Sequence, residues 1–239
     1  MSKALLLSDS ARARVVGIFS SLQGEGPYLG ERQIFVRFGG CNLRCDYCDE
    51  PHTITIPSGR VLSIQDIERG IASLAKTRPQ RTVSWTGGEP LLHPLILTRL
   101  MRWARRKGLQ NHLETNGVLP APMAALAPLC DAVAMDIKLP SSTGRETWSA
   151  HRAFLQAAPS GTFVKVVLTS RSTVAEWRIV LDVLKHAPRP VPLFLQPATP
   201  IGAVKPIAAA RCLRFEAMAR KVVKKVVVRP QWHPLWGLP

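Results

Sequence analysis

The chain has 239 residues, of which 46% are hydrophobic and only 20% charged, a composition that excludes a disordered polypeptide and suits a sizeable folded core. Lysine and arginine total 32 against 16 aspartates and glutamates, so the formal net charge is +16. No apolar run approaches the roughly 18 residues of a membrane span. The apolar patch at residues 4–7 is too short to be the core of a secretion signal, so we expect a cytoplasmic protein without a membrane partner.

Short apolar runs bounded by turn residues predict β-strands along the whole chain. The expected strands are 15–20, 33–38, 82–85, 112–114, 132–136, 163–168, 192–195 and 225–228. Amphipathic helical patterns lie between several of them. One is expected to begin at the Ser63 cap with Asp66 three residues later, and another to run from Pro94 to a stop near Gly108. Two more cover the segments around 177–184 and 208–220.

Alternation of strands and helices, with strands that are apolar on both faces, predicts a parallel sheet with right-handed crossovers. A complete eightfold barrel needs about 250 residues, more than this chain supplies. We therefore expect an α/β fold with a partial, open parallel β/α barrel, formed by a single domain over residues 1–239.

Polar or glycine-rich segments follow the predicted strands. They are residues 86–90, 114–117, 136–138, 169–171, 196–199 and 231–234. The carboxyl ends of parallel strands share one edge of the sheet, where ligands bind in such folds. The sequence therefore predicts a binding site at this edge.

Three cysteines, Cys41, Cys45 and Cys48, occur in a C-x3-C-x2-C spacing after the strand that ends at Phe38. They could be buried core thiols, although the polar residues between them disfavour this, or structural zinc ligands with His52 as the fourth. A third possibility is a [4Fe–4S] cluster held by three thiolates, which leaves one iron open to another ligand. A thioredoxin-like redox pair is disfavoured because Cys45 and Cys48 do not begin a clear helix. The other two cysteines, Cys130 and Cys212, lie in apolar runs and are expected to be buried structural thiols.

The cysteine spacing, with the aromatic Tyr47 before the last cysteine, resembles the signature of the radical S-adenosylmethionine (SAM) superfamily. The segment Thr86-Gly87-Gly88-Glu89-Pro90 is similar to the GGEP motif of the same superfamily. The resemblance implies a [4Fe–4S] cluster and SAM as cofactors. It also implies that glycines allow the backbone to approach the methionyl ammonium closely.

The flanking segments resemble one family within it, the 7-carboxy-7-deazaguanine synthases. The resemblance rests on the string FSSLQGEGPYLGERQIFVRFGGCNLRCDYCD and on the later words TGGEP and ETNG. It implies conversion of 6-carboxy-5,6,7,8-tetrahydropterin to 7-carboxy-7-deazaguanine with loss of ammonia, for queuosine-type deazapurine biosynthesis. It further implies a homodimer and an electron donor such as flavodoxin or ferredoxin.

The family resemblance also implies roles for individual residues. On the pterin side these are Leu22, Gln23, Gly24, Glu25, Arg37, Thr86, His233 and Pro239. On the SAM side they are Tyr47, Cys48, Asp49, Gly88, Asp136, Ile137, Lys138, Gln196, Pro197, Ala198 and Thr199. Residues 39–52 form the cluster loop, and residues 229–239 are expected to close over the substrate.

One position departs from the family pattern. Where the family has a threonine that ligates Mg²⁺, this chain has Glu50. A carboxylate is a good ligand for this ion, so we expect Glu50 to bind Mg²⁺, with loss of the metal or a changed substrate as alternatives.

Two other functions compete with this interpretation. A glycyl-radical-enzyme activase, or another radical SAM enzyme acting on a related heterocycle, would share the cysteine loop, but the QGEG segment argues against an activase. A zinc-bearing nucleic-acid-binding protein would explain the basic charge. The cluster 102–107 lies on the polar side of its helix, however, which favours a solvated face, and we expect no nucleic-acid partner.

Overall fold

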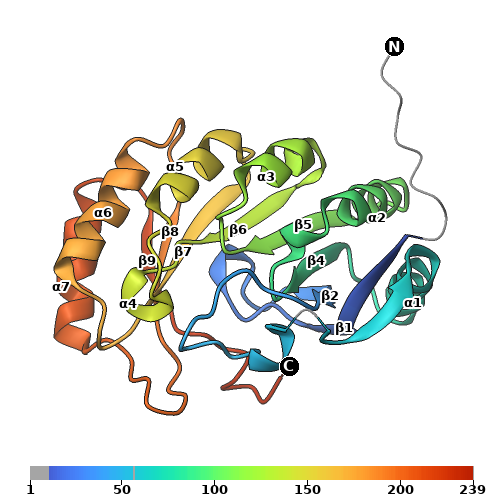
Figure 1. The fold of residues 1–239 in the computed structure, drawn as a ribbon, viewed down its shortest axis with the longest axis horizontal. Coiled ribbons are helices and arrows are strands. Elements are labelled where there is room, and N and C mark those ends of the chain that lie inside the picture. Colours follow the sequence, from blue (N-terminus) through green and yellow to red (C-terminus); the bar gives the residue numbers. More distant parts are fainter. Residues whose placement is uncertain (1–10, 56, 239) are drawn as a thin grey trace.

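The computed structural model describes residues 11–55 and 57–238. Its strands form a single curved sheet in the order β3-β1-β2-β4-β5-β6-β7-β8-β9. Their bounds are β1 Arg12–Leu22, β2 Arg32–Phe38, β3 Arg60–Ser63, β4 Thr82–Gly87, β5 Gln110–Thr115, β6 Ala132–Asp136, β7 Thr162–Leu168, β8 Leu193–Pro197 and β9 Val226–Val228. The ends β3 and β9 do not pair with each other, so the barrel is open as expected (Figure 1).

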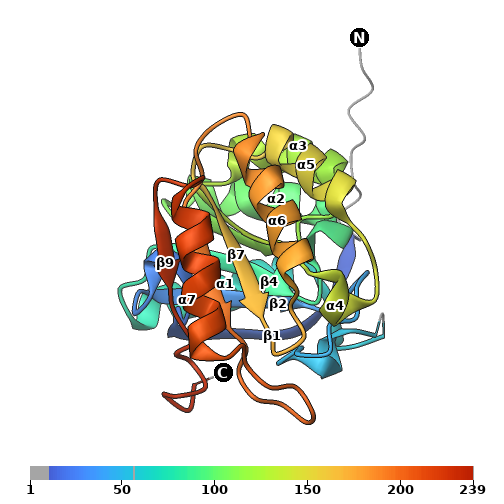
Figure 2. The ribbon, with the colours of Figure 1, turned by 90° about the vertical axis from the view of Figure 1, so that its left-hand side faces the viewer.

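Helices cover the outer face of the sheet (Figures 1 and 2). The α-helices are α1 Ile64–Thr77, α2 Pro94–Arg106, α3 Pro120–Leu126, α4 Pro140–Thr143, α5 Trp148–Ala157, α6 Val174–Lys185 and α7 Ala209–Arg220. Short 3₁₀ helices are η1 Gly26–Tyr28, η2 Pro51–Thr53, η3 Pro90–Leu92 and η4 Ala127–Leu129. Within the described residues, no helix is long and apolar enough to cross a membrane. The patch at residues 4–7 lies outside the described part of the chain.

Capping residues and hydrophobic periodicity predicted the long helices correctly. Ser63 and Asp66 form a reciprocal capping box at the start of α1, with the Ser63 hydroxyl accepting from the Asp66 amide at 3.1 Å. α2 begins at Pro94, and Gly108, just beyond its end, has a φ of +74°. The sequence patterns did not predict α3, α4, α5 or β3, which are short or weakly periodic.

The sheet is parallel from β2 to β9, but β1 runs antiparallel to both β2 and β3. The expected open parallel barrel is therefore confirmed, with an antiparallel edge at β1 and β3 that the sequence patterns did not predict. A parallel neighbour needs a crossover of a dozen or more residues, usually helical, whereas the connection from Leu22 to Arg32 is short and contains only η1. Because β1 is antiparallel to β2 and Leu22 pairs with Arg32, the QGEG segment follows β1 at the edge where the parallel strands begin, opposite the edge where they end.

The core lies between the sheet and the helices. Trp177 of α6 is fully buried, stacks on Phe215 of α7 with ring centroids 5.1 Å apart, and donates from its indole nitrogen to the Phe215 carbonyl at 3.0 Å. Cys130 and Cys212 belong to the same buried cluster, which confirms them as structural thiols.

Replacing Trp177 by alanine should lower the free energy of unfolding by about 3–5 kcal/mol, because it opens a cavity and removes a buried aromatic pair. Urea unfolding followed by far-ultraviolet circular dichroism measures the loss. Trp236→Ala is the matched control, since Trp236 is 40% exposed and should change stability by no more than about 0.5 kcal/mol. Equal losses in the two variants would contradict this account of the core.

Candidate active site

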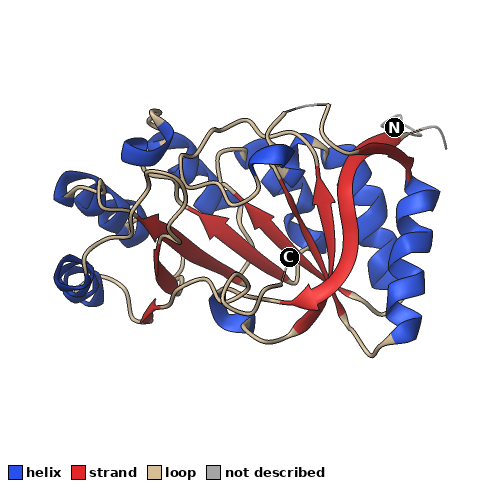
Figure 3. Ribbon diagram, turned by 90° about the horizontal axis from the view of Figure 1, so that it is seen from below, coloured by secondary structure: helices blue, strands red, loops and turns tan. Residues whose placement is uncertain are grey.

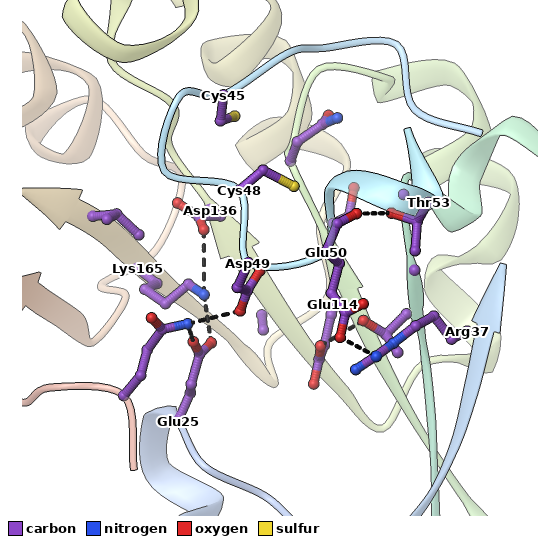
Figure 4. A pocket seen from close by; sticks show the side chains of 18 of the residues that line it. Glu25, Arg37, Cys45, Cys48, Asp49, Glu50, Thr53, Glu114, Asp136 and Lys165 are labelled. Carbon is purple, nitrogen blue, oxygen red and sulfur yellow. Dashed lines mark hydrogen bonds and ion pairs between the residues drawn. The ribbon is translucent and has the colours of Figure 1, made fainter. Parts of the chain in front are cut away.

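A pocket opens where the parallel strands end, beneath the cluster loop and the C-terminal segment (Figure 4). Figure 3 shows the curved sheet with helices along its outer face and loops at the ends of its strands. Most residues expected to bind ligands line it. These are Leu22, Gln23, Gly24, Glu25, Arg37, Cys41, Cys45, Tyr47, Cys48, Asp49, Glu50, Thr86, Gly88, Asp136, Lys138, Thr199 and His233. Segments far apart in sequence therefore meet at one site.

Four expected residues are not among those that line the pocket, and one lies outside the description. Ile137 is fully buried in the core, while Pro197 ends β8, Ala198 follows it, and neither lines the pocket. Gln196 reaches the site indirectly, because its amide donates to Glu25 at 3.0 Å. Pro239 lies outside the described residues.

The cluster loop is fixed from several sides. The amides of Gly40 and Cys41 donate to the carbonyls of Thr53 and Ile54, at 2.7 and 3.1 Å. The Asp46 amide donates to the Ser142 carbonyl at 3.0 Å. Two arginines also hold the loop: Arg145 donates to the Asn42 carbonyl at 3.2 Å, and Arg171 forms an ion pair with Asp46. The three thiols are thus presented from a constrained backbone.

Gly87 and Gly88 allow the end of β4 to pack directly against the cluster loop. Gly87 has a φ of +130°, and a Cβ there would lie 2.2 Å from the Phe38 carbonyl oxygen. A Cβ on Gly88 would lie 2.2 Å from the Gly40 oxygen. Two backbone hydrogen bonds stabilise this contact. The Gly88 amide donates to the Phe38 carbonyl at 3.0 Å, and the Glu89 amide donates to the Gly40 carbonyl at 2.8 Å. These glycines are therefore required by the packing of the protein itself, in addition to any approach to SAM.

Glu89 joins the same motif to the segment after β5. Its buried carboxylate accepts from the Leu91 amide at 3.0 Å, the Thr115 hydroxyl at 2.8 Å and the Asn116 amide at 2.8 Å. Burial raises the pKa of this carboxyl to about 7, although the three donors favour the ionised form. Glu89 is thus a structural residue that holds two rim segments together.

The cysteines fit an iron–sulfur cluster better than a zinc ion. Cys41, Cys45 and Cys48 are free and all line the pocket. Among the described residues, no three His, Cys, Asp or Glu side chains converge closely enough to share one metal ion. Zinc requires its ligands to meet around one atom, whereas the three thiolates of a [4Fe–4S] cluster bind three separate irons and stand apart. Burial raises the pKa of Cys48 to about 11, so its ionisation requires a metal to bind the sulfur.

On the opposite side of the pocket, Arg37 forms an ion pair with Glu50 (Figure 4). The second carboxylate oxygen of Glu50, Oε2, is buried and has no hydrogen-bond donor among the described residues. The exposed ring of His52 places Nε2 at 3.0 Å from this oxygen. The negative charge of Glu50 is thus balanced by Arg37, and the ring of His52 lies beside its second oxygen.

A line of alternating charges crosses the pocket. Glu25 pairs with Lys165, which lies 3.3 Å from Asp136, and Asp136 accepts from Lys138 at 2.7 Å. The Lys138 ammonium lies 5.1 Å from the centre of the Tyr47 ring. Burial alone would raise the pKa of Glu25, but the Lys165 ammonium overcomes this effect and lowers it.

The C-terminal segment is attached to both sides of the pocket. The Trp232 amide donates to the Gly24 carbonyl at 3.0 Å, and Gln231 donates to Glu25 at 2.7 Å and to Asp49 at 3.0 Å. His233 Nε2 lies 3.5 Å from the Asp49 carboxylate. Burial opposes a charged imidazole, but Asp49 outweighs it and raises the pKa of His233. The segment is therefore held both to the QGEG segment and to the cluster loop.

Several residues that line the pocket had no role assigned from the sequence, among them Lys165, Glu114 and Gln231. Glu114 accepts from Gln23 at 2.8 Å, Ser84 at 2.9 Å and Thr86 at 2.7 Å. A lysine in the middle of the apolar strand β7 was a visible signal for Lys165. Glu114 and Gln231 lay within the polar segments but had no assigned role.

Comparison with known proteins agrees with this geometry. The family model for the radical SAM superfamily matches residues 35–185. A 7-carboxy-7-deazaguanine synthase from Geobacter sulfurreducens is 34% identical, with 94% of this chain and 97% of that protein covered. The chain belongs to the 7-carboxy-7-deazaguanine synthase family of radical SAM enzymes.

Further relatives of this family agree. A 7-carboxy-7-deazaguanine synthase from Methanopyrus kandleri is 37% identical over 77% of this chain and 81% of its own length. The crystal structure of QueE from Escherichia coli has a TM-score of 0.63, with 92% of this chain and 94% of that chain covered. At 21% identity, that structure supports the fold alone. Membership implies a [4Fe–4S] cluster and SAM, and the expectation that Cys41, Cys45 and Cys48 hold the cluster stays a prediction.

Changing Cys41, Cys45 or Cys48 to alanine should abolish both the brown absorbance of the reconstituted cluster and the cleavage of SAM. Each thiolate binds one iron, so the loss of one leaves the cluster without a stable attachment. Absorption spectra with iron and sulfide analysis measure the effect. Cys212→Ala is the control and should retain the cluster, because that thiol is buried away from the pocket. A full cluster in any of the three loop variants would refute the assignment.

Proposed function

We propose that the chain converts 6-carboxy-5,6,7,8-tetrahydropterin to 7-carboxy-7-deazaguanine with release of ammonia, as a carbon–nitrogen lyase of queuosine-type deazapurine biosynthesis. The observation that carries this proposal is the meeting of the QGEG residues and Arg37 with the cysteine loop in one pocket. The radical SAM loop alone would support many reactions. The QGEG segment adds polar recognition groups on the side opposite the SAM-binding rim.

The cluster and SAM, when bound, supply the radical that takes a hydrogen atom from the substrate. The protein binds, orients and encloses the reactants. Arg37 uses Nη1 for Glu50, and a guanidinium has five N–H donors, so it can bind a substrate carboxylate while retaining Glu50. Gln23 and Glu25 are held by Glu114 and Lys165 in positions suited to the polar ring of a pterin.

The ligand contacts are assigned to two groups of residues. The pterin side comprises Leu22, Gln23, Gly24, Glu25, Arg37, Thr86, His233 and Pro239. The SAM side comprises Tyr47, Cys48, Asp49, Gly88, Asp136, Ile137, Lys138, Gln196, Pro197, Ala198 and Thr199. Ile137, Pro197 and Ala198, whose side chains do not line the pocket, would contribute through their backbone.

Glu50 is the proposed Mg²⁺ ligand. Its Oε2 accepts no hydrogen bond among the described residues and has only the exposed ring of His52 beside it, so it offers a hard anionic donor to a cation. Mg²⁺ commonly takes one or two protein carboxylates and completes its shell with water and substrate oxygens. Arg37 balances the added negative charge, so an anionic substrate meets a neutral pair and the cation. The metal would neutralise and orient the substrate carboxylate.

The same family membership supports a one-electron donor such as flavodoxin or ferredoxin, and a homodimer, as partners. The five free cysteines support a reducing compartment such as the cytoplasm. A single buried cluster that draws on elements from both ends of the sheet supports one domain over the whole chain.

Anaerobically reconstituted protein, given SAM, a reductant and 6-carboxytetrahydropterin, should form 7-carboxy-7-deazaguanine and ammonia. Mass spectrometry of the product identifies the deazapurine, and the Cys45→Ala variant serves as the inactive control. Cleavage of SAM without the deazapurine would retain the superfamily and reject the proposed substrate.

Glu50→Gln should weaken Mn²⁺ binding, measured by electron paramagnetic resonance with Mn²⁺ as the Mg²⁺ substitute, and lower turnover by at least about tenfold. An amide removes the negative charge that holds a hard cation. Glu216→Gln on α7 is the control and should change neither quantity. Turnover that is unaffected by a chelator, together with equal Mn²⁺ binding by wild type and Glu50→Gln, would remove the metal from the site.

A further inference from the structure

Lys165 interrupts an otherwise apolar strand. The sequence of β7 is TFVKVVL, and its other side chains are buried. The Lys165 side chain is only 14% exposed and lines the pocket. Burying a lysine costs free energy unless partners compensate its charge, so its position requires an explanation.

Its ammonium lies between the two ligand-binding sides of the pocket (Figure 4). On one side it forms an ion pair with Glu25 of the QGEG segment. On the other it lies 3.3 Å from Asp136 Oδ2, at the end of β6. Glu25 is assigned to the pterin and Asp136 to SAM, so a single side chain contacts one residue from each group.

Each carboxylate has further partners that fix its direction. Glu25 Oε1 accepts from Gln196 at 3.0 Å and from Gln231 at 2.7 Å, which leaves Oε2 for Lys165. Asp136 Oδ2 accepts from Lys138, while Oδ1 is buried without a donor among the described residues. Moving Lys165 would therefore disturb two oriented carboxylates at once.

We propose that Lys165 is a positioning residue that couples the pterin side of the pocket to the SAM side. By holding Glu25 and Asp136 to one ammonium, it fixes the separation of the two bound molecules. A hydrogen atom transfers efficiently only when donor and acceptor are aligned, so this separation decides whether SAM cleavage leads to product. The inference rests on the proposed function for its assignment of Glu25 to the pterin and of Asp136 to SAM.

A purely structural role makes a different prediction. If Lys165 only compensated buried charge, its loss would reduce the amount of folded protein, and the remaining enzyme would behave normally. A coupling role instead changes how the folded enzyme uses SAM. The number of 5′-deoxyadenosine molecules released for each deazapurine formed distinguishes the two roles.

The test compares Lys165→Met, which keeps the length of the side chain without its charge, with Lys165→Arg, which keeps the charge. Reconstituted proteins are matched for iron content and assayed for the KM of the pterin, the Kd of SAM and the ratio of 5′-deoxyadenosine to product. Lys165→Met should raise both constants by at least about tenfold, since it leaves Glu25 without its ion-pair partner and removes one of the two ammonium groups beside Asp136. It should also raise the ratio severalfold, and Lys165→Arg should recover part of each loss. Lys185→Met, at the exposed end of α6, is the matched control and should resemble wild type.

The proposal would be overturned if iron-matched Lys165→Met had a pterin KM, a SAM Kd and a ratio of 5′-deoxyadenosine to product within twofold of wild type. A lower yield of folded protein with an unchanged KM and Kd would also overturn it. If Lys165→Met does not fold, Lys165→Arg must still show a raised ratio, because its longer, planar group cannot reproduce both contacts. If wild type cleaves SAM but makes no deazapurine, the proposed function has failed. The Kd of SAM then still tests the link to Asp136, because equal binding by wild type and Lys165→Met would overturn it.

Discussion

The site depends on the close contact between the end of β4 and the cluster loop. The two glycines of the TGGEP segment permit it, because a side chain at either position would collide with backbone atoms of Phe38 or Gly40. Glu89, the next residue, extends the contact through its buried carboxylate to the turn after β5. One short segment thus fixes the loop that carries the cysteines relative to two neighbouring strands. A substitution at Gly87 or Gly88 would disturb the site through packing, without any direct effect on a ligand.

Electrostatics imposes the second constraint. The pocket contains carboxylates and cations that are largely removed from water, so each must have an oppositely charged neighbour. Glu25, Lys165, Asp136 and Lys138 lie in a row of alternating charge, so each of them has an oppositely charged neighbour. On the opposite wall, Arg37 and Glu50 neutralise each other. The polar groups are therefore ordered before ligands arrive, which reduces the cost of binding.

Much of this arrangement could be predicted from the sequence, and the exceptions have physical causes. The long helices and the parallel strands were visible because caps, periodicity and apolar runs are local signals, as at Ser63 and in β7. The antiparallel direction of β1 was not predicted, because it follows from the short connection between Leu22 and Arg32 and not from the residues of the strand. Motifs identified the cysteines and most of the pocket. Lys165, Glu114 and Gln231 were missed because their importance comes from partners distant in sequence, such as Glu25 and Asp136 for Lys165.

The net charge of +16 does not extend into the pocket. Among the charged residues that line it, the carboxylates of Glu25, Asp49, Glu50, Glu114 and Asp136 outnumber the cations of Arg37, Lys138 and Lys165. A sulfonium and an ammonium, the cationic groups of SAM, are favoured by such a surplus of carboxylates, whereas a carboxylate ligand must bind next to one of the few cations. The acidic surplus therefore restricts anionic ligands to the neighbourhood of Arg37, Lys138 and Lys165. The excess positive charge of the chain lies elsewhere on the protein, so it does not explain how ligands are selected within the pocket.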